Sequence, residues 1–395
     1  MKEKIKKLNN EILNWFLKDV IPRWENEGVD FKYGGFHEEI NKKGPITLPK
    51  RTRVVCRQIY FFYIAYKLKN KKNFLNLIDH GAEFLFQNLL SVEKDSFIYS
   101  NDISSNKKNN NLYLYEQSFA LLGLAVIYKK STVYSSDALF LAKKIIKRIR
   151  ELWGINLNEI NNSFFWKDHF LSDPYMHLLE SFLFWEEILS DSEKKEDICF
   201  WRDLSKELIN LTFEKFIDPN TNFIHEAIQI KNTYKDVKNP FELKIYPGHQ
   251  YEWGSLIYLY GINNQSDCHY NYGSKIIRDI EIYGIDKKHN TIANEINTEY
   301  KITDKSFKLW PQTERIKAWG LIIKNNKFKK DLTIEYKNYI SSLKGFLKFI
   351  DNDYIGCWKE IMLPNGKWIE KNVKASSLYH IASAIDILNS INKEL

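Results

Sequence analysis

The sequence predicts an all-α fold, an (α/α)6 barrel with short β-hairpins in the connections on the cleft side. Two observations lead to this prediction. Apolar residues recur at positions i, i+3 and i+4 through most of the 395-residue chain, which is the spacing of helices that bury one face. Segments that are apolar over most of their circumference also alternate with amphipathic ones, as expected when an inner ring of helices is wrapped by an outer ring.

About twelve helices are expected. The first follows the N-terminus, and the second, at 51–69, is apolar almost all round with arginines near its start. In chain order the expected helices are 3–18, 51–69, 73–90, 114–130, 135–152, 174–190, 195–213, 249–262, 267–284, 311–324, 328–350 and 375–391.

The connections between helices contain short β-hairpin signals. Residues 31–44 alternate like a hairpin, and Asn365-Gly366 is typical of a two-residue turn between strands. Long ordered connections on one side of a helical barrel commonly form the binding cleft. No linker-like stretch interrupts the chain, so we expect a single domain over 1–395. A solenoid of helical pairs is the nearest alternative, although no repeat of constant period is visible.

Composition excludes several classes of partner. Hydrophobic residues make up 44% of the chain and the net charge is +8, but the lysines are scattered among acidic residues. This pattern favours a lysine-rich surface over a nucleic-acid groove. No apolar run approaches the roughly 18 residues of a membrane span. The four separated cysteines form no Cys-x-x-Cys pair, so we expect no zinc site and a cytoplasmic location.

Three histidines are the most informative residues. His177, His249 and His380 each lie near the predicted start of an apolar helix, and Glu180 and Glu252 follow the first two by three residues. The helix dipole favours the neutral imidazole at such a position, and a neutral imidazole can act as a base. A single histidine of this kind is usually a buried structural residue, whereas three similarly placed ones favour a site.

An arginine and several aromatic residues complete the candidate site. Arg57 lies inside an apolar helix, so it needs a partner from elsewhere in the chain or an anionic ligand. We expect Arg51 and Arg53, nearer the helix start, to be solvated. Flat faces on which a sugar ring could pack are offered by Tyr115, Phe119, Trp253 and Trp310, although each alone could be a core residue.

The sequence resembles the N-acylglucosamine 2-epimerase superfamily, which includes mannose isomerases and cellobiose 2-epimerases. The resemblance covers nearly the whole chain. The matching strings are Tyr33-Gly-Gly-Phe36, Arg57-Gln58, Tyr115-Glu-Gln-Ser-Phe119, Pro174-Tyr-Met-His177-Leu-Leu-Glu180, Pro247-Gly-His249-Gln-Tyr-Glu252-Trp253, Trp310-Pro-Gln-Thr-Glu314, Cys357-Trp-Lys-Glu360 and Tyr379-His380. The resemblance implies an (α/α)6 barrel that interconverts sugars through an enediol(ate), with no metal and no nicotinamide or other cofactor.

The resemblance also implies roles for individual residues. His249 would move the C2 proton, His380 would be the second acid/base, and Arg57 would bind the enediolate oxygen. The expected substrate-binding residues are His177, Glu180, Glu252, Trp253, Tyr115, Trp310 and Glu314. This chain departs from the family at Tyr115-Glu-Gln-Ser-Phe119, where Tyr-Asp-His-Ala-Phe is common, and at Asp173, where asparagine is common.

The function expected from the resemblance is isomerisation of a mannose-type aldose to its ketose. The strings Arg51-Thr-Arg53-Val and Trp310-Pro-Gln-Thr-Glu314 look closer to the mannose-isomerase branch. One alternative is 2-epimerisation of N-acylglucosamine or another sugar. A glycoside hydrolase on the same barrel, with paired carboxylates such as Glu252 and Glu314, is a second. We expect a small-molecule sugar substrate, no nucleic-acid or membrane partner, and a monomer or homodimer.

Overall fold

The computed structural model describes residues 1–156, 169–190, 195–229, 244–326 and 331–395. Over these residues the chain is mostly helical, and the strands are two or three residues long and pair antiparallel. The predicted mixture of helices and short hairpins is therefore confirmed. Contacts divide the chain into two compact units: the first comprises Met1–Gly28, Glu39–Pro45 and Leu243–Leu395, and the second comprises Val29–Glu38 and Ile46–Glu242. The expectation of a single domain stays a prediction.

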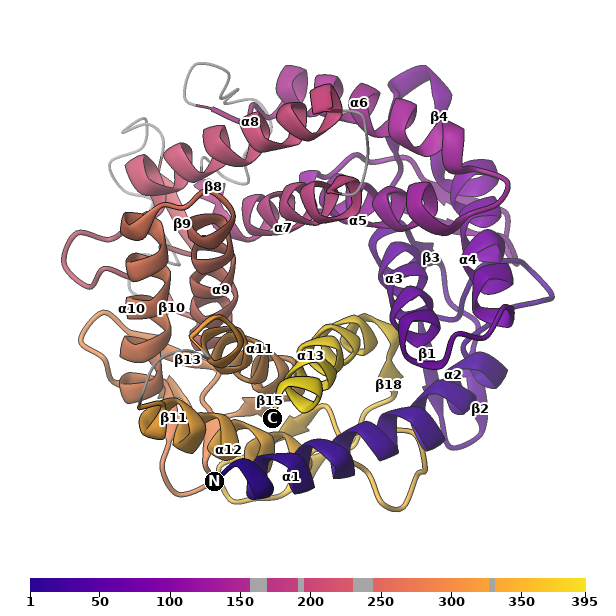
Figure 1. Cartoon of the computed structure of the whole chain (residues 1–395). Helices are drawn as coiled ribbons and strands as arrows, with labels where there is room; N and C mark the ends of the chain where they lie inside the picture. The colour runs from indigo at the N-terminus through magenta and orange to yellow at the C-terminus, as the bar shows by residue number, and fades with distance from the viewer. Residues whose placement is uncertain (157–168, 191–194, 230–243, 327–330) are drawn as a thin grey trace, which may run out of the picture. The chain divides into compact units, whose positions relative to one another are not determined.

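The second unit contains three helices buried over most of their circumference and three amphipathic ones. The buried helices are α3 (Thr52–Lys69), α5 (Leu114–Lys130) and α7 (Ser172–Leu189). The amphipathic helices are α4 (Asn73–Phe84), α6 (Ser135–Leu152) and α8 (Lys195–Leu211). α5 packs between α3 and α7, and the amphipathic helix that follows each buried helix in the chain packs against that helix (Figure 1).

The first unit has the same organisation. Its buried helices are α9 (Pro247–Asn263), α11 (Leu309–Asn325) and α13 (Ala375–Glu394). Its amphipathic helices are α10 (Asp267–Tyr283), α12 (Thr333–Leu347) and α1 (Lys2–Trp15). α11 packs against α9 and α13, α10 covers α9, α12 covers α11, and α1 packs on α12 and α13. The predicted alternation and bounds are confirmed within a few residues, and the predicted start of α12 at 328 lies outside the described residues.

Short sheets precede the buried helices. In the second unit they are β3 (Lys50–Arg51) with β6 (Ser100–Asp102) and β7 (Lys107–Asn109), β4 (Leu90–Ser91) with β5 (Ser96–Phe97), and β8 (His169–Leu171) with β9 (Ala227–Gln229). In the first unit they are β10 (Lys244–Ile245), β13 (Glu295–Asn297) and β14 (Ile302–Asp304); β11 (Ile285–Asp286) and β12 (Thr291–Ile292); β15 (Phe307–Lys308), β16 (Ile361–Met362) and β17 (Trp368–Ile369); and β18 (Val373–Lys374), β1 (Glu39–Asn41) and β2 (Gly44–Ile46). Strands β3, β8, β10, β15 and β18 each run into the start of a buried helix, so the sheets lie at helix N-termini.

Glutamines on two buried helices attach the strands β5 and β12 to the helix ends. On α5, the Gln117 side chain accepts a hydrogen bond from Phe97 N at 2.9 Å and donates one to Phe97 O at 2.7 Å. On α11, Gln312 makes the equivalent pair with Ile292, at 3.1 and 3.4 Å. A side-chain amide can satisfy both groups of one strand residue because it carries a donor and an acceptor. The connections are therefore fixed relative to the helix N-termini.

Two predicted hairpins have different outcomes. The hairpin at Asn365-Gly366 is confirmed, since it joins β16 to β17, but the two-residue turn is not: Leu363 N donates to Lys367 O across a three-residue loop, in which Gly366 takes a left-handed φ of 82°. The hairpin expected over 31–44 is confirmed in part: β1 pairs with β2 around the turn at 42–43, but it also pairs with β18, and Phe36 bridges Val29. Alternation alone does not identify the partner strand. The short helix α2 (Ile21–Glu27) was not predicted.

A buried ion pair joins α10 to α9 and α11. The carboxylate of Glu281 accepts hydrogen bonds from Tyr251 at 2.6 Å, Arg315 Nε at 2.9 Å and Trp319 at 2.8 Å. The Arg315 side chain is 1% exposed. Removing one partner from such a pair leaves an uncompensated buried charge.

We therefore predict that Glu281→Ala lowers the free energy of unfolding by roughly 3–5 kcal/mol. The matched control is Asp279→Ala on the same helix, whose exposed pair with Lys275 should contribute less than about 1 kcal/mol. Urea unfolding followed by circular dichroism compares the two variants. Equal midpoints for them would contradict this role of the Glu281 network.

Candidate active site

In the first unit, His249 and His380 both pack against Trp310. The His249 and Trp310 ring centroids are 5.2 Å apart, and those of Trp310 and His380 are 5.6 Å apart. Gly248 permits this packing, because a Cβ at that position would lie 2.5 Å from the Trp310 ring. His249 is the third residue of α9, and His380 lies in the second turn of α13. The predicted placement of both histidines near helix N-termini is confirmed.

His380 is held by a carboxylate on the neighbouring helix. Its Nδ1 lies 2.7 Å from Glu314 Oε1, and Glu314 is completely buried. Gly320 on α11 allows the two helices to approach closely, since a Cβ there would lie 2.4 Å from Ile387 of α13. The start of α13 is fixed by Glu360, which accepts hydrogen bonds from Ser377 Oγ at 2.9 Å and from Lys374 N at 3.2 Å.

The charge of Glu314 is set by opposing effects. Burial favours the neutral acid, but Lys317 and the hydrogen bond from His380 outweigh it, and the pKa of Glu314 lies below its usual value. Lys317 Nζ is 2.8 Å from Glu314 Oε2. Glu314 is therefore a carboxylate at neutral pH, and a carboxylate Oε1 can accept a hydrogen bond from His380 Nδ1.

Three side chains of the first unit lie close enough to share a metal ion. One ligand atom from each of Glu252, Glu314 and His380 lies within 4.8 Å of the others. However, the ammonium of Lys317 already lies beside Glu314 and would repel a divalent cation. The donor set therefore does not favour a metal site.

In the second unit, Arg57 lies among aromatic rings. Its guanidinium donates a hydrogen bond to the Tyr115 hydroxyl at 3.1 Å and lies 4.0 Å from the centre of the Phe119 ring. The His177 ring contacts both aromatic residues, with centroid distances of 5.3 Å to Tyr115 and 4.4 Å to Phe119. Burial, and then the nearby Asp173, raise the pKa of Tyr115, so its hydroxyl stays protonated.

His177 lies between two carboxylates. Its Nδ1 is 3.0 Å from Glu180 Oε2, as the spacing of three residues predicted, and its Nε2 is 3.4 Å from Asp173 Oδ1. Each ring nitrogen thus lies near a carboxylate oxygen. This environment suits orientation of a substrate better than removal of a proton.

Arg51 and Arg53 were expected to be solvated, and this prediction is wrong. Arg51 Nε donates to Glu38 at 2.8 Å, and Arg53 pairs with Glu116, whose carboxylate also accepts from Arg53 N at 2.7 Å. Glu116 is completely buried. Its place inside an apolar helix was the signal that a cation had to accompany it.

The predicted site residues thus form two clusters, one in each unit. The first unit brings together His249, Glu252, Trp310, Glu314 and His380, with Trp253 fully buried on the same helix as His249. The second unit brings together Arg57, Tyr115, His177 and Glu180. That both clusters act on one substrate stays a prediction. Lys317 was not predicted as a site residue. Asp173 was named only because family members often have asparagine there, and no role was predicted for it.

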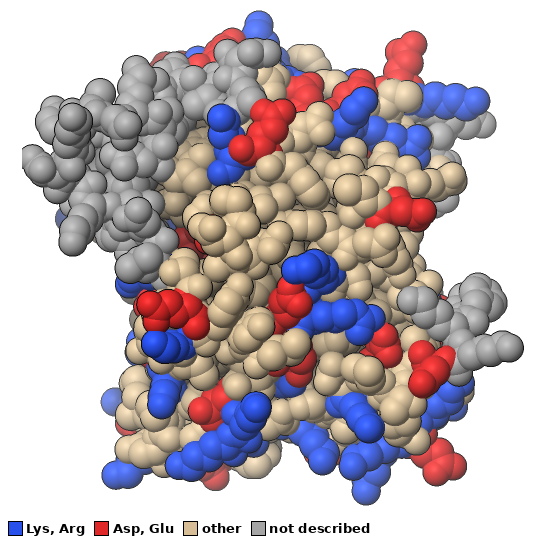
Figure 2. Space-filling view, turned by 90° about the vertical axis from the view of Figure 1, so that its left-hand side faces the viewer, with Lys and Arg blue, Asp and Glu red and all other residues tan. Residues whose placement is uncertain are grey.

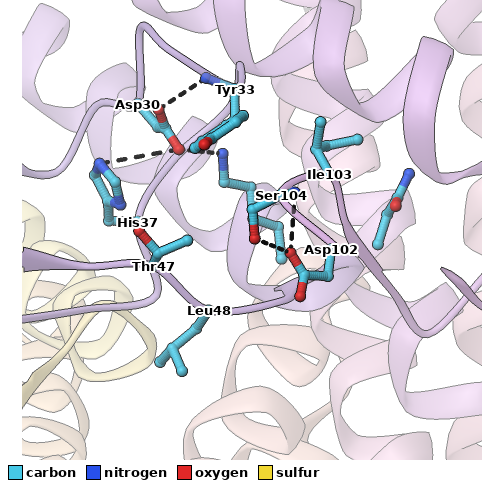
Figure 3. A pocket seen from close by; sticks show the side chains of 10 residues that line it. Asp30, Tyr33, His37, Thr47, Leu48, Asp102, Ile103 and Ser104 are labelled. Atoms are coloured by element: carbon cyan, nitrogen blue, oxygen red, sulfur yellow. Dashed lines mark hydrogen bonds and ion pairs between the residues drawn. The ribbon is translucent and has the colours of Figure 1, made fainter. Parts of the chain in front are cut away.

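A small pocket in the second unit (Figure 3) has none of these residues in its lining. It is lined by Asp30, Tyr33, His37, Thr47, Leu48, Lys50, Asn101, Asp102, Ile103 and Ser104. Lys50 Nζ lies 2.6 Å from Asp30 Oδ2, and both side chains are almost fully buried. Because the cation and the anion neutralise each other, the pair stabilises the loop before α3.

On the face drawn in Figure 2, basic and acidic side chains are interspersed, and no large patch of one charge is seen. This mixture agrees with the scattered lysines of the sequence. Among the helices that the structure describes, none has the length and apolar character needed to span a membrane.

Comparison with known proteins identifies the family. The model described as N-acylglucosamine 2-epimerase (GlcNAc 2-epimerase) matches residues 34–384. Mannose-6-phosphate isomerase of Rhizobium meliloti (strain 1021) is 23% identical over 396 residues, covering 98% of this chain and 97% of the relative.

Solved structures share the fold. Cellobiose 2-epimerase from Bacillus thermoamylovorans B4167 superposes with a TM-score of 0.78 at 18% identity, covering 96% of this chain and 99% of that chain. A D-mannose isomerase gives a TM-score of 0.79 at 17% identity, covering 96% and 97%. The predicted (α/α)6-barrel fold class and the predicted enzyme class, a sugar isomerase or epimerase, are confirmed. With the match extending over nearly all of its length, the chain belongs to the N-acylglucosamine 2-epimerase family.

Proposed function

We propose that the protein is a sugar isomerase that converts a mannose-type aldose into its ketose by histidine-mediated proton transfer through a cis-enediol(ate). The observation that carries this proposal is the arrangement of His249 and His380 on Trp310, with His380 hydrogen-bonded to the buried Glu314. Two imidazoles beside an aromatic ring provide proton-transfer groups next to a surface on which a sugar can pack. The names of the relatives, mannose-6-phosphate isomerase and D-mannose isomerase, support the substrate class.

The proposed roles follow from the chemistry of the first step. His249 removes the proton at C2 of the open-chain aldose, and His380 moves protons at its Nε2, since Nδ1 is engaged by Glu314. A positioned base of this kind typically contributes about 10²–10⁴-fold. The proton then returns to C1, which gives the ketose.

Arg57 is the proposed donor to the developing oxyanion, and one such donor can contribute about 10²–10³-fold. Its packing on Phe119 and its hydrogen bond to Tyr115 fix the direction of the guanidinium. His177, held by Glu180, is a proposed substrate-orienting residue. Glu252, Trp253, Tyr115, Trp310 and Glu314 complete the proposed substrate-binding set.

Epimerisation at C2 is the second candidate. It shares the first proton removal and differs in returning the proton to the opposite face of C2. The family description and the cellobiose 2-epimerase structure favour this alternative. The family description names an N-acylated sugar as the substrate of its namesake.

A glycoside hydrolase is a third candidate, because carboxylate oxygens of Glu252 and Glu314 lie within 4.8 Å of each other. Retaining glycosidases place their two carboxyl groups about 5 Å apart. Against this reading, Glu314 is completely buried and its oxygens face Lys317 and His380. A nucleophile or acid needs an oxygen that reaches the glycosidic bond, so proton transfer by the histidines accounts for the geometry better.

The remaining parts of the proposal are catalysis without metal or other cofactor, a monomer or homodimer, and a cytoplasmic location. The ammonium beside Glu314 supports metal-independent chemistry. All four cysteines are free thiols, which suits a reducing compartment.

We predict that mannose, or its phosphorylated relative, gives the corresponding ketose, whereas an N-acylated 2-amino aldose, which has no hydroxyl at C2, can only be epimerised. A panel of free, phosphorylated and N-acylated aldoses is incubated with the protein, and the products are identified by proton NMR. A ketose as the main product supports the isomerase. Formation of the C2 epimer alone would replace the isomerase by an epimerase.

We also predict that His249→Ala lowers kcat by about 10²–10⁴-fold, because the base that removes the C2 proton is lost. The matched control is His269→Ala, a histidine on the covering helix α10 whose ring contacts Tyr260. The control should keep nearly full activity. Substantial activity in His249→Ala would favour the hydrolase reading, and release of a reducing sugar from a mannoside would establish it.

A further inference from the structure

Lys317 is a largely buried cation that none of the proposed roles uses. It lies on α11, three residues after Glu314, and its side chain is 12% exposed. Its Nζ is 2.8 Å from Glu314 Oε2, while the other oxygen of Glu314 lies 2.7 Å from His380 Nδ1. Lys317, Glu314 and His380 therefore form a continuous chain of contacts from α11 to α13.

The protonation state of Glu314 decides what His380 can do. A carboxylate accepts a hydrogen bond from Nδ1–H, which leaves the lone pair of the neutral ring on Nε2. A neutral carboxylic acid would instead donate its proton toward Nδ1 and favour the tautomer with hydrogen on Nε2. In that tautomer Nε2 cannot accept a proton, and a histidine held in the wrong tautomer is a poor base.

Lys317 is the charge that keeps Glu314 ionised. Burial disfavours the carboxylate, and the carboxyl group of Glu252 on α9 lies close enough to add repulsion. Lys317 is the largest of the effects that oppose burial and lower the pKa of Glu314. Among the described residues of the first unit, the titratable groups close to Glu314 include Lys317 on its own helix, Glu252 on α9 and His380 on α13.

We propose that Lys317 is a positioning residue for the acid/base His380: it holds Glu314 as a carboxylate and thereby keeps the proton of the neutral imidazole on Nδ1. This inference rests on the proposed function for its kinetic consequences, but the tautomer itself can be observed without turnover. A lysine that filled space or neutralised a buried charge without acting through Glu314 would leave the tautomer unchanged.

The test compares Lys317→Met, which keeps most of the length of the side chain and removes the charge, with Lys317→Arg, which keeps the charge. Lys324→Met on the same helix is the control for loss of a lysine. The first readout is the nitrogen NMR spectrum of protein labelled with ¹⁵N-histidine, with the His380 signals assigned by their loss in His380→Gln. We expect the Nδ1–H tautomer of His380 in the wild type, Lys317→Arg and Lys324→Met, and the Nε2–H tautomer in Lys317→Met.

The second readout is the pH dependence of kcat. We expect Lys317→Met to lower kcat about tenfold to hundredfold near pH 7 with little change in KM. Losing Lys317 raises the pKa of Glu314, so the carboxylate would form only at higher pH and the acidic limb of the profile would move upward. Lys317→Arg should recover most of the activity and the original profile. Glu314→Gln combined with Lys317→Met should be no slower than Glu314→Gln alone.

An unchanged His380 tautomer and pH profile in Lys317→Met would overturn the proposal, as would an arginine variant as impaired as the methionine variant. If Lys317→Met does not fold, the arginine variant and Glu314→Gln decide the question. Wild-type protein that turns over no aldose would contradict the proposed function, whereas the tautomer comparison would still test the role of Lys317.

Discussion

The candidate site of the first unit depends on keeping one fully buried carboxylate charged. Glu314 has no contact with solvent, so its ionised form is stable only because Lys317 and His380 occupy its two oxygens at 2.8 and 2.7 Å. The contact between Glu314 and His380 also joins α11 to α13. The contact that stabilises the packing of α11 against α13 therefore also orients the proposed acid/base group, His380.

The absence of a side chain at two glycines makes this arrangement possible. Gly248 leaves room for Trp310 against the first turn of α9, and Gly320 lets α13 approach α11. The strands β10, β15 and β18 lead directly into α9, α11 and α13, and Gln312 and Glu360 tie those connections to the helices. Side chains at the helix N-termini are thereby fixed by several independent hydrogen bonds, which is the pre-organisation that proton transfer requires.

Much of the fold could be predicted because helical periodicity is a local property of the sequence. The buried and amphipathic helices, the positions of His177, His249 and His380 near helix starts, and the His177–Glu180 hydrogen bond all follow from spacing within one helix. The pairing of β1 with β18 was missed because the two strands are more than 300 residues apart in the chain and alternation does not identify a partner.

The difference between spacing within one helix and contacts between distant segments also explains which site residues the sequence did not reveal. Lys317 could not be recognised as important, because its significance comes from a histidine on another helix that Glu314 also contacts. Arg53 was judged solvated since its partner, Glu116, lies 63 residues further along the chain. Charges in apolar helices, such as Arg57 and Glu116, do signal a partner from sequence, but the identity of that partner requires the tertiary structure.

The proposed mechanism depends on imidazole groups that transfer the C2 proton of a sugar. This step is tested by following the sugar in deuterated buffer by NMR, with the wild type and with His249→Ala. Solvent deuterium should enter C1 of the ketose or C2 of the aldose in the wild-type reaction, and His249→Ala should lose this incorporation together with turnover. Turnover with no deuterium in the sugar, or unchanged incorporation in the variant, would show that the histidine does not transfer this proton.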